Sequence, residues 1–148
     1  MKTKKLTYVL FILLSFNGFA QEKLATFETS KTEITTMMLQ QAKDWSNGDI
    51  DAFMQGYIKS DSLKFIGSNG LTYGWKNTLE NYKKGYPTKE HTGILTFNLL
   101  DFDQLAEGLF LVIGEFHLKR TVGDANGMFS IILKRIAGEW KIIADHSS

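Results

Sequence analysis

The sequence predicts an α+β domain in which three helices accompany an antiparallel sheet. Two observations carry this prediction. Apolar residues recur at helical spacing through much of the first half of the chain, whereas from residue 93 onward they follow a strand-like pattern. The separators between the later segments are short and rich in Gly, Asn or Asp, as antiparallel hairpins require. The predicted elements do not alternate between strand and helix in repeated crossover units, which argues against a doubly wound parallel sheet.

The first twenty residues have the pattern of a secretory signal. Three Lys residues open the chain, residues 6–16 form an almost unbroken apolar run, and small residues precede a cleavage point before Gln21. The apolar run is shorter than the roughly 20 residues that span a bilayer, although an uncleaved anchor is the alternative. We expect a signal peptide at residues 1–20, a flexible leader at 21–29 and a folded domain at 30–148. The domain would then be exported, to the periplasm or the medium, and free of the membrane after cleavage.

Composition excludes some classes of function. Without residues 1–20 the chain has 14 basic and 16 acidic side chains, a formal net charge of −2. A mildly acidic domain without a basic stripe is a poor candidate for nucleic acid, whose binding depends on neutralising phosphates. The sequence contains no Cys, which rules out thiol chemistry and cysteine metal sites.

The helices are expected in the first part of the domain. Ser30 is predicted to cap the first helix, with Glu33 completing a capping box, and an apolar stripe runs from Ile34 to Trp45. Asn47-Gly48 ends this helix, and Asp49 caps a short second one. The third helix is predicted over residues 75–86 and is closed by Pro87.

The strands form two groups. Residues 63–66 and 71–73 are predicted to pair across the turn of residues 67–70. A four-strand meander follows, predicted at residues 93–103, 109–121, 128–135 and 140–147.

Three stretches of this chain carry a resemblance to a known family. They are the junction at residues 45–49, the turn at residues 70–74 and the ending at residues 138–148. In this order they resemble the nuclear-transport-factor-2-like superfamily over about residues 30–148, nearest to its SnoaL-like and ketosteroid-isomerase-like branch. They are also similar to the association domain of calcium/calmodulin-dependent protein kinase II. The resemblance implies a cone-like curved sheet wrapped by the helices around a pocket. It implies no single activity, because this fold serves enzymes, binders and assembly modules.

Alternation along the strands decides which side chains would line that pocket. By similarity to the superfamily, the face with Ile113, Glu115, His117 and Lys119 is expected to be the pocket side. Phe129 and Ile131 would face inward from the next strand, and Ile143, Asp145 and Ser147 from the last. The outward set would then hold the following residues: Phe116, Leu118, Met128, Ser130, Ile132, Trp140, Ile142 and His146.

Candidate catalytic residues are Glu115, His117 and Asp145. A carboxylate beside an imidazole could move protons near neutral pH, and a desolvated Asp could act as a base. The alternatives are a solvated strand edge or simple polar pairing. Asp145, His146 and Ser147 cannot form a triad, because neighbours on a strand point to opposite faces. The remaining pocket candidates are Tyr57, Phe65, Tyr73, Trp75, Tyr82, Phe129, Ile131 and Ser147.

Three functions stay open. The first is a protein that binds a small, partly apolar ligand. The second is an acid–base isomerase, dehydratase or cyclase that uses the candidates above, although Ile131 stands about where ketosteroid isomerase has its acidic hydrogen-bond donor. The third is an assembly module. We expect a homodimer through the outer sheet face, and no metal or cofactor. The residues assigned to this dimer face are Phe116, Leu118, Met128, Ile132 and Ile142.

Overall fold

The computed structural model describes residues 26–148. The chain divides into two compact units, Met1–Glu33 and Ile34–Ser148, and each is considered by itself. Within the described part of the first unit the chain is helical, and the expected signal peptide of residues 1–20 lies outside the described residues. None of the helices in the described part combines the length and the apolar character that a membrane crossing needs.

The predicted helix start at Ser30 is wrong. Residues 26–29 are already helical, so the expected flexible leader of residues 21–29 is helical in its described part. The Thr32 hydroxyl donates to the Glu28 carbonyl at 2.9 Å, the bond to the preceding turn that Ser and Thr make inside helices. The capping-box pattern therefore occurs here within a helix and does not mark its start.

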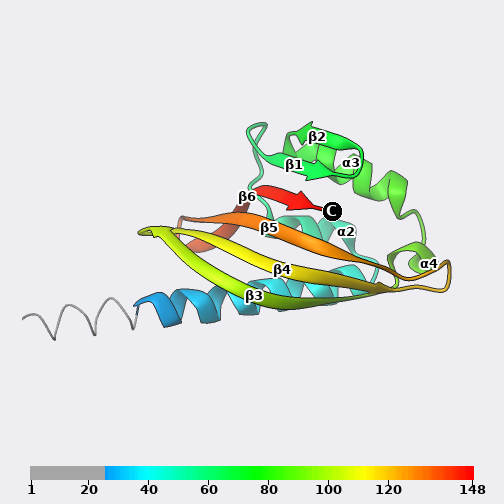
Figure 1. Cartoon of the computed structure of the whole chain (residues 1–148). Helices are drawn as coiled ribbons and strands as arrows, with labels where there is room; N and C mark the ends of the chain where they lie inside the picture. The colour runs from blue at the N-terminus through cyan, green and yellow to red at the C-terminus, as the bar shows by residue number, and fades with distance from the viewer. Residues whose placement is uncertain (1–25) are drawn as a thin grey trace, which may run out of the picture. The chain divides into compact units, whose positions relative to one another are not determined.

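The second unit continues this helix through residue 46 and then holds all six strands. Its short helices and strands appear in Figure 1. In chain order they are α2 (Ile50–Phe53), η1 (Met54–Gly56), β1 (Lys64–Gly67), β2 (Gly70–Tyr73), α3 (Trp75–Gly85), α4 (Lys89–Thr92), β3 (Ile94–Ala106), β4 (Leu109–Lys119), β5 (Ala125–Ile136) and β6 (Glu139–Ser147).

The helical spacing predicted from the sequence buries the expected stripe. Ile34, Met38, Ala42 and Trp45 are all less than a tenth exposed, in agreement with an amphipathic helix. As predicted, the Asp49 carboxylate caps α2, accepting a hydrogen bond from the Ala52 amide at 2.9 Å. The four-residue helix α4 was not predicted, because one polar turn has no apolar period to reveal it.

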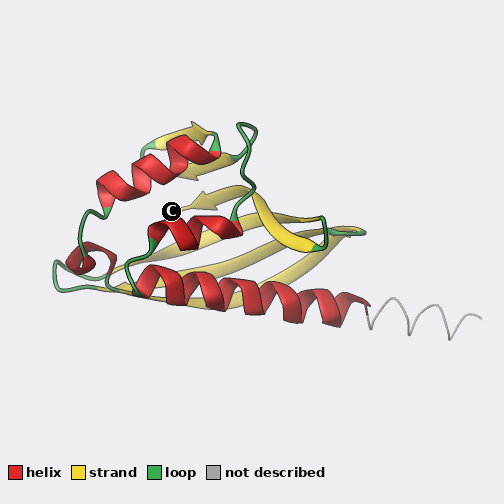
Figure 2. Ribbon diagram, turned by 180° about the vertical axis from the view of Figure 1, so that it is seen from behind, coloured by secondary structure: helices red, strands yellow, loops and turns green. Residues whose placement is uncertain are grey.

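The strands form one sheet in the order β2-β1-β6-β5-β4-β3. The predicted hairpin of β1 and β2 and the four-strand meander are confirmed. One pair departs from an antiparallel sheet, because β1 lies parallel to β6. The sheet is therefore mixed, and the hairpin extends it beside the last strand. Figure 2 shows α2 and the helical residues 34–46 on one face of this sheet.

Irregular register bends the long strands. Along β3, the partners shift between Leu99 and Asp101 and again between Gln104 and Ala106. On β6 a shift occurs where Ile132 pairs with Ala144 but Leu133 pairs with Ile142, which leaves Ile143 as the extra residue. Such bulges bend a strand and increase its twist, which favours a curved sheet. The predicted α+β fold with a curved, unclosed sheet is confirmed.

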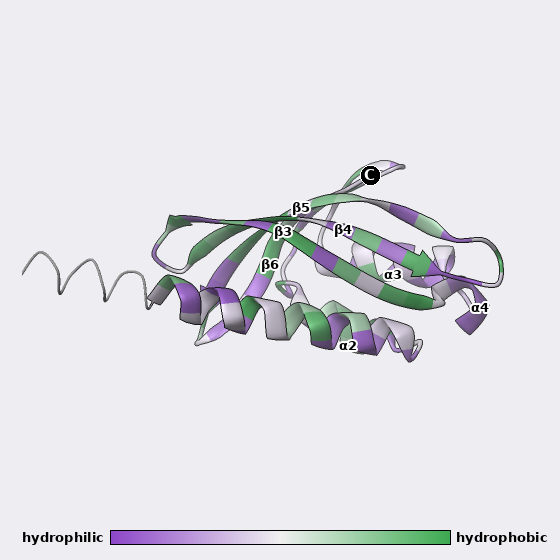
Figure 3. Ribbon diagram, turned by 60° about the horizontal axis from the view of Figure 1, so that its bottom comes forward, coloured by the Kyte–Doolittle hydropathy of each residue, from purple (hydrophilic) through white to green (hydrophobic). Residues whose placement is uncertain are grey.

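The face assignment of β4 was wrong. Phe110, Val112 and Leu118 are buried on the helix side of the sheet, whereas Glu115 and His117 lie on the opposite face. Registration with the neighbouring strands explains this: Gly114 lies opposite Phe129 and Phe116 opposite Gly127. Residues paired across a ladder share a face, so Phe129 and Glu115 could not both point inward. Figure 3 shows the alternation of hydrophobic and hydrophilic residues along the strands.

The last strand was predicted with one constant alternation, which is also wrong. Trp140 and Ile142 are buried together with Asp145, although Asp145 comes three positions after Ile142 and strict alternation would put the two on opposite faces. Ile143 is the extra residue of a bulge. The alternation restarts after it, so Ile142 before the bulge and Asp145 after it both point to the interior. His146 is exposed, as predicted.

Candidate functional site

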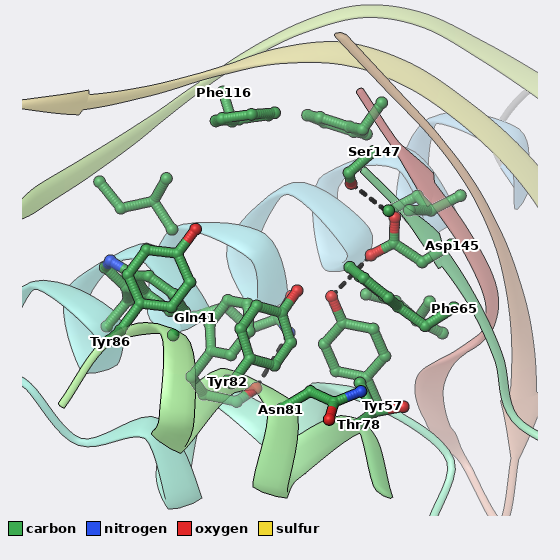
Figure 4. A pocket seen from close by; sticks show the side chains of 18 of the residues that line it. Gln41, Tyr57, Phe65, Thr78, Asn81, Tyr82, Tyr86, Phe116, Asp145 and Ser147 are labelled. Carbon is green, nitrogen blue, oxygen red and sulfur yellow. Dashed lines mark hydrogen bonds between the residues drawn. The ribbon is translucent and has the colours of Figure 1, made fainter. Parts of the chain in front are cut away.

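A cavity of about 450 Å³ lies between the helices and the inner face of the sheet. All of its lining residues belong to the second unit. Nine of its 27 lining residues are aromatic, and Figure 4 shows several of the rings around the open space. The aromatic members of the lining are Trp45, Phe53, Tyr57, Phe65, Tyr82, Tyr86, Phe97, Phe116 and Phe129.

Asp145 is the one carboxylate side chain in the lining. It is only 5% exposed, yet both of its oxygens have donors. Tyr57 Oη donates to Oδ2 at 2.7 Å, and Ser147 Oγ donates to Oδ1 at 2.7 Å. Figure 4 shows both bonds and places the three side chains at one end of the view. Short bonds of this kind are typical of a carboxylate that accepts from hydroxyls.

The chain positions these groups from two distant segments. Tyr57 follows η1 and forms an isolated parallel bridge with Ile142, and the next amide, Ile58 N, donates to the Ile142 carbonyl at 2.9 Å. The bulge at Ile143 then turns Asp145 inward. Asp145 lies opposite Ile131 on β5 and Phe65 on β1, so apolar neighbours flank the carboxyl.

Burial favours the protonated forms of Asp145, Tyr57 and Tyr82. Desolvation raises the pKa of Asp145, and the donors Tyr57 and Ser147 oppose that rise without cancelling it. Burial and the nearby Asp145 carboxylate likewise hold the pKa values of Tyr57 and Tyr82 well above the ordinary tyrosine value. The tyrosines therefore stay protonated at physiological pH, as hydrogen-bond donors. The Asp145 carboxyl keeps its proton to a higher pH than a solvated Asp.

Two more hydroxyls come from Tyr82 of α3 and from Tyr86, the residue that caps its C-terminus. Tyr82 and Tyr86 are one helical turn apart, and their rings lie 5.4 and 4.7 Å from that of Trp45, both edge-on. Trp45 is itself fixed by a hydrogen bond from Nε1 to the Thr92 carbonyl at 2.9 Å. In Figure 4 the hydroxyls of Tyr82 and Tyr86 point into the space beneath Phe116. The helix thus presents hydrogen-bonding groups across an apolar cavity.

Six of the eight expected pocket residues lie in the lining: Tyr57, Phe65, Tyr82, Phe129, Ile131 and Ser147. Two do not. Tyr73 is 54% exposed, because β2 is the edge strand and turns this side chain away. Trp75 is buried outside the cavity, where its Nε1 donates to the Met54 carbonyl at 2.8 Å.

The catalytic candidates are separated. Asp145 lies in the cavity, but Glu115 and His117 form a half-exposed pair on the other face of the sheet, with His117 Nε2 3.7 Å from Glu115 Oε2. Asn98 also donates to Glu115, at 3.0 Å. The polar pair was placed inward by resemblance. The alternation of Phe110, Val112, Phe116 and Leu118 in the sequence itself indicated the observed orientation.

The predicted dimer face changes with this correction. Phe116, Leu118 and Ile142 line the cavity and cannot belong to the outer face. Met128 and Ile132 keep their outward orientation, since they share ladder positions with Glu115 and Leu111. Met128 is 42% exposed.

Arg120 is a lining residue that the sequence gave no reason to select. It directly follows β4 and is the one cationic side chain in the lining. Its Nε donates to the Gly123 carbonyl at 2.7 Å, and its backbone amide donates to Asp124 Oδ1 at 2.8 Å. Within the described residues no group of three His, Asp or Glu side chains is arranged to hold a metal ion.

Several solved structures have a similar architecture. A protein of unknown function from Shewanella oneidensis, described as NTF-2 like, is 35% identical, with a TM-score of 0.77 over 80% of this chain and 98% of the other. A superfamily protein from Salmonella enterica aligns with a TM-score of 0.65 at 21% identity, covering 82% of this chain and 91% of that one. A ketosteroid isomerase-like protein from Erwinia carotovora aligns with a TM-score of 0.62 at 15% identity, covering 79% and 93%. No family model and no curated protein matches the sequence.

Proposed function

The chain belongs to the nuclear-transport-factor-2-like superfamily, and from this fold and its cavity we propose that it binds a small, partly apolar molecule. The observation that carries the proposal is the composition of the cavity. Aromatic and aliphatic side chains make up 14 of its 27 lining residues, and polar groups lie among them, with Asp145, Tyr57 and Ser147 joined by hydrogen bonds. Small-molecule sites have this combination, and about 450 Å³ falls within their usual range of volumes.

The polar groups indicate how such a ligand would be oriented. A protonated Asp145 carboxyl can donate a hydrogen bond, and the Tyr82 and Tyr86 hydroxyls can donate or accept. The ligand would therefore carry an oxygen or nitrogen at the Asp145 end and an apolar body along Phe116, Phe129 and Ile131. Burying that body against the rings would supply most of the affinity.

Filling the cavity with a larger side chain tests the proposal. We would titrate the protein with the dye 8-anilinonaphthalene-1-sulfonate and compare it with the variants Ile131→Trp and Ile132→Trp. Ile131 lines the cavity, whereas its neighbour Ile132 is outside the lining, so the same substitution occupies the cavity in one case only. We expect Ile131→Trp to lose the dye and Ile132→Trp to keep it. Equal binding by both variants would mean that the dye sits elsewhere. Mass spectrometry of protein purified from its own host would then identify the natural ligand.

An acid–base enzyme is the second candidate, now with Asp145 alone as proton carrier. Its support is the raised pKa of a carboxyl that lies against the cavity. For any molecule recovered from the cavity, Asp145→Asn should abolish turnover while binding remains. Turnover that persists in Asp145→Asn at the wild-type rate would leave ligand binding as the better description.

Two further expectations remain proposals. Export is supported by the charge and apolar pattern of residues 1–20. Cell fractionation followed by N-terminal sequencing should find the protein outside the cytoplasm, beginning at Gln21. A homodimer through the outer sheet face is supported by the exposure of Met128, which shares that face of β5 with Ile132.

A further inference from the structure

The cavity has one ionisable side chain of opposite type near each end, a guanidinium and a carboxyl. Among its lining side chains Arg120 is the sole cation and Asp145 the sole carboxyl. Asp145 lies opposite Ile131, while Leu118, two residues before Arg120, lies opposite Ala125. From Ile131 to Ala125 the chain advances six residues, roughly 20 Å of strand at about 3.3 Å per residue. The backbone positions of the two groups therefore lie far apart along the sheet.

Apolar side chains occupy the distance between them. Leu118 and Phe116 of β4 and Phe129 and Ile131 of β5 form one continuous inner surface, because the members of each pair are two positions apart and so point to the same face. In the view of Figure 4, Phe116 and Asp145 lie on the sheet side, with Tyr86 and Tyr82 opposite. A molecule lying along this surface would meet rings and aliphatic groups over its whole middle part.

The Arg120 side chain is held at its base and unpaired at its tip. Gly93, with φ of +61°, leaves room for it: a Cβ at that position would lie 2.6 Å from Arg120 Cγ. Nε is used by the Gly123 carbonyl, so one of the five guanidinium donors has a partner. Among the described residues no carboxylate forms an ion pair with Arg120. The remaining donors form the planar fork that matches a carboxylate.

The opposite end of the cavity does not repel an anion. Burial raises the pKa of Asp145, which favours its neutral form, and Tyr57 and Ser147 already donate to it. The lining offers one guanidinium, at the Arg120 end. A hydroxyl or keto group on the ligand could pair with Asp145 or Tyr82 at the other end.

Building on the proposed small-molecule binding, we propose that the ligand is an amphipathic organic acid. Its carboxylate is held by Arg120, its apolar chain lies over Phe116 and Phe129, and its far end carries a hydroxyl or keto group toward Asp145. The guanidinium sets the direction in which the ligand enters the cavity.

The test uses probes that differ only in their head group. Decanoate, decanol and decylamine share one chain, and calorimetric titration of each into the wild-type protein measures the contribution of charge. We expect decanoate to bind at least about 10-fold more tightly than decanol, as a hydrogen bond to a charged group predicts, and decylamine to bind most weakly. Because a ten-carbon chain is shorter than the distance between Arg120 and Asp145, the contact at the far end is tested with 16-hydroxyhexadecanoate against hexadecanoate. The added hydroxyl should strengthen binding to the wild-type protein, and this gain should disappear in Asp145→Ala.

Variants at two neighbouring positions test whether Arg120 causes the preference for decanoate over decanol. Arg120→Gln should lose the preference for decanoate and keep the affinity for decanol, whereas Lys119→Gln, which removes the same charge from an exposed side chain, should change neither. Arg120→Lys keeps the charge without the fork and should retain part of the preference. If Arg120→Gln does not fold, the order of the three probes on the wild-type protein still decides.

The outcomes separate this inference from the proposed function. If all three probes bind the wild-type protein equally, or if decanoate binds Arg120→Gln as tightly as it binds the wild-type protein, the anion site is refuted and ligand binding stands. If no probe binds and Ile131→Trp leaves dye binding unchanged, the cavity is not a binding site and both proposals fail.

Discussion

The hydrogen bond between Tyr57 and Asp145 should stabilise the fold by an amount that depends on pH. The change that exposes this is Tyr57→Phe, which removes only the hydroxyl that donates to Asp145 Oδ2 at 2.7 Å. Both residues are buried, Tyr57 at 4% and Asp145 at 5% exposure, so water cannot readily replace the lost donor. The variant leaves a buried carboxyl oxygen without this partner.

The magnitude follows from the protonation state of Asp145. When the carboxyl is ionised, losing a hydrogen bond to a charged group costs about 1.5–3 kcal/mol, but when it is neutral the loss is nearer 1 kcal/mol. Burial raises the folded-state pKa of Asp145 above its unfolded value, and Tyr57 lowers it, so Tyr57→Phe raises it further. A raised carboxyl pKa gives stability that is fully present below the unfolded pKa and lost as pH rises through the folded one. The penalty of the variant therefore grows with pH across the window above the ordinary Asp pKa.

The assay is urea unfolding followed by tryptophan fluorescence, at a pH near 4 and at pH 8. The control is Tyr73→Phe, because Tyr73 is 54% exposed and lies outside the cavity. We expect Tyr57→Phe to lose about 1 kcal/mol more stability at pH 8 than at the acid pH, and Tyr73→Phe to change little at either. An equal loss for Tyr57→Phe at both pH values would refute the role assigned to the Asp145 charge. A loss no larger than that of Tyr73→Phe would refute the buried hydrogen bond itself.

Two further changes test the packing of the sheet. Gly114→Ala should destabilise the fold by about 1–3 kcal/mol and weaken dye binding, because a Cβ there would lie 2.5 Å from Phe129 Cζ and would displace that ring. Gly85→Ala, where an added Cβ meets no atom within 4 Å, is the control for unfolding and dye titration, and an equal effect of both would contradict the packing account. Met128→Asp should convert the proposed homodimer to a folded monomer in analytical ultracentrifugation, whereas Leu39→Asp, at an exposed leucine on the first helix, should not. A Met128→Asp protein that sediments like the wild type would exclude this face as the interface.

The strength of the local patterns explains which elements could be predicted. Ile34, Met38 and Trp45 repeat at helical spacing, and the meander is punctuated by Gly-containing turns, so helices and hairpins follow from neighbouring residues alone. The short α4 and the parallel pairing of β1 with β6 could not be predicted in this way. A four-residue turn has no period, and the choice of partner strand joins segments some 80 residues apart.

The candidate site shows the same division. Asp145 and Tyr57 were each selected as pocket residues, but their hydrogen bond joins positions 88 apart in the chain. Glu115 and His117 were placed inward by similarity to the superfamily, although the apolar alternation of Phe116 and Leu118 indicated the reverse. Arg120 was missed because a single Arg after a strand is common at surfaces, and only its position over Gly93 brings it to the cavity.

By itself the sequence determined the types of the main elements, most of their order and the family resemblance, because these depend on the spacing of apolar residues and on turn chemistry along a short stretch of chain. The tertiary structure decided which faces of the strands are enclosed. The register between strands fixes the inner face of β4, and the one extra residue at Ile143 reverses the alternation within β6. Because the side-chain period of a strand is two, a single inserted residue turns Asp145 from one face to the other, and no pattern within the strand reveals it.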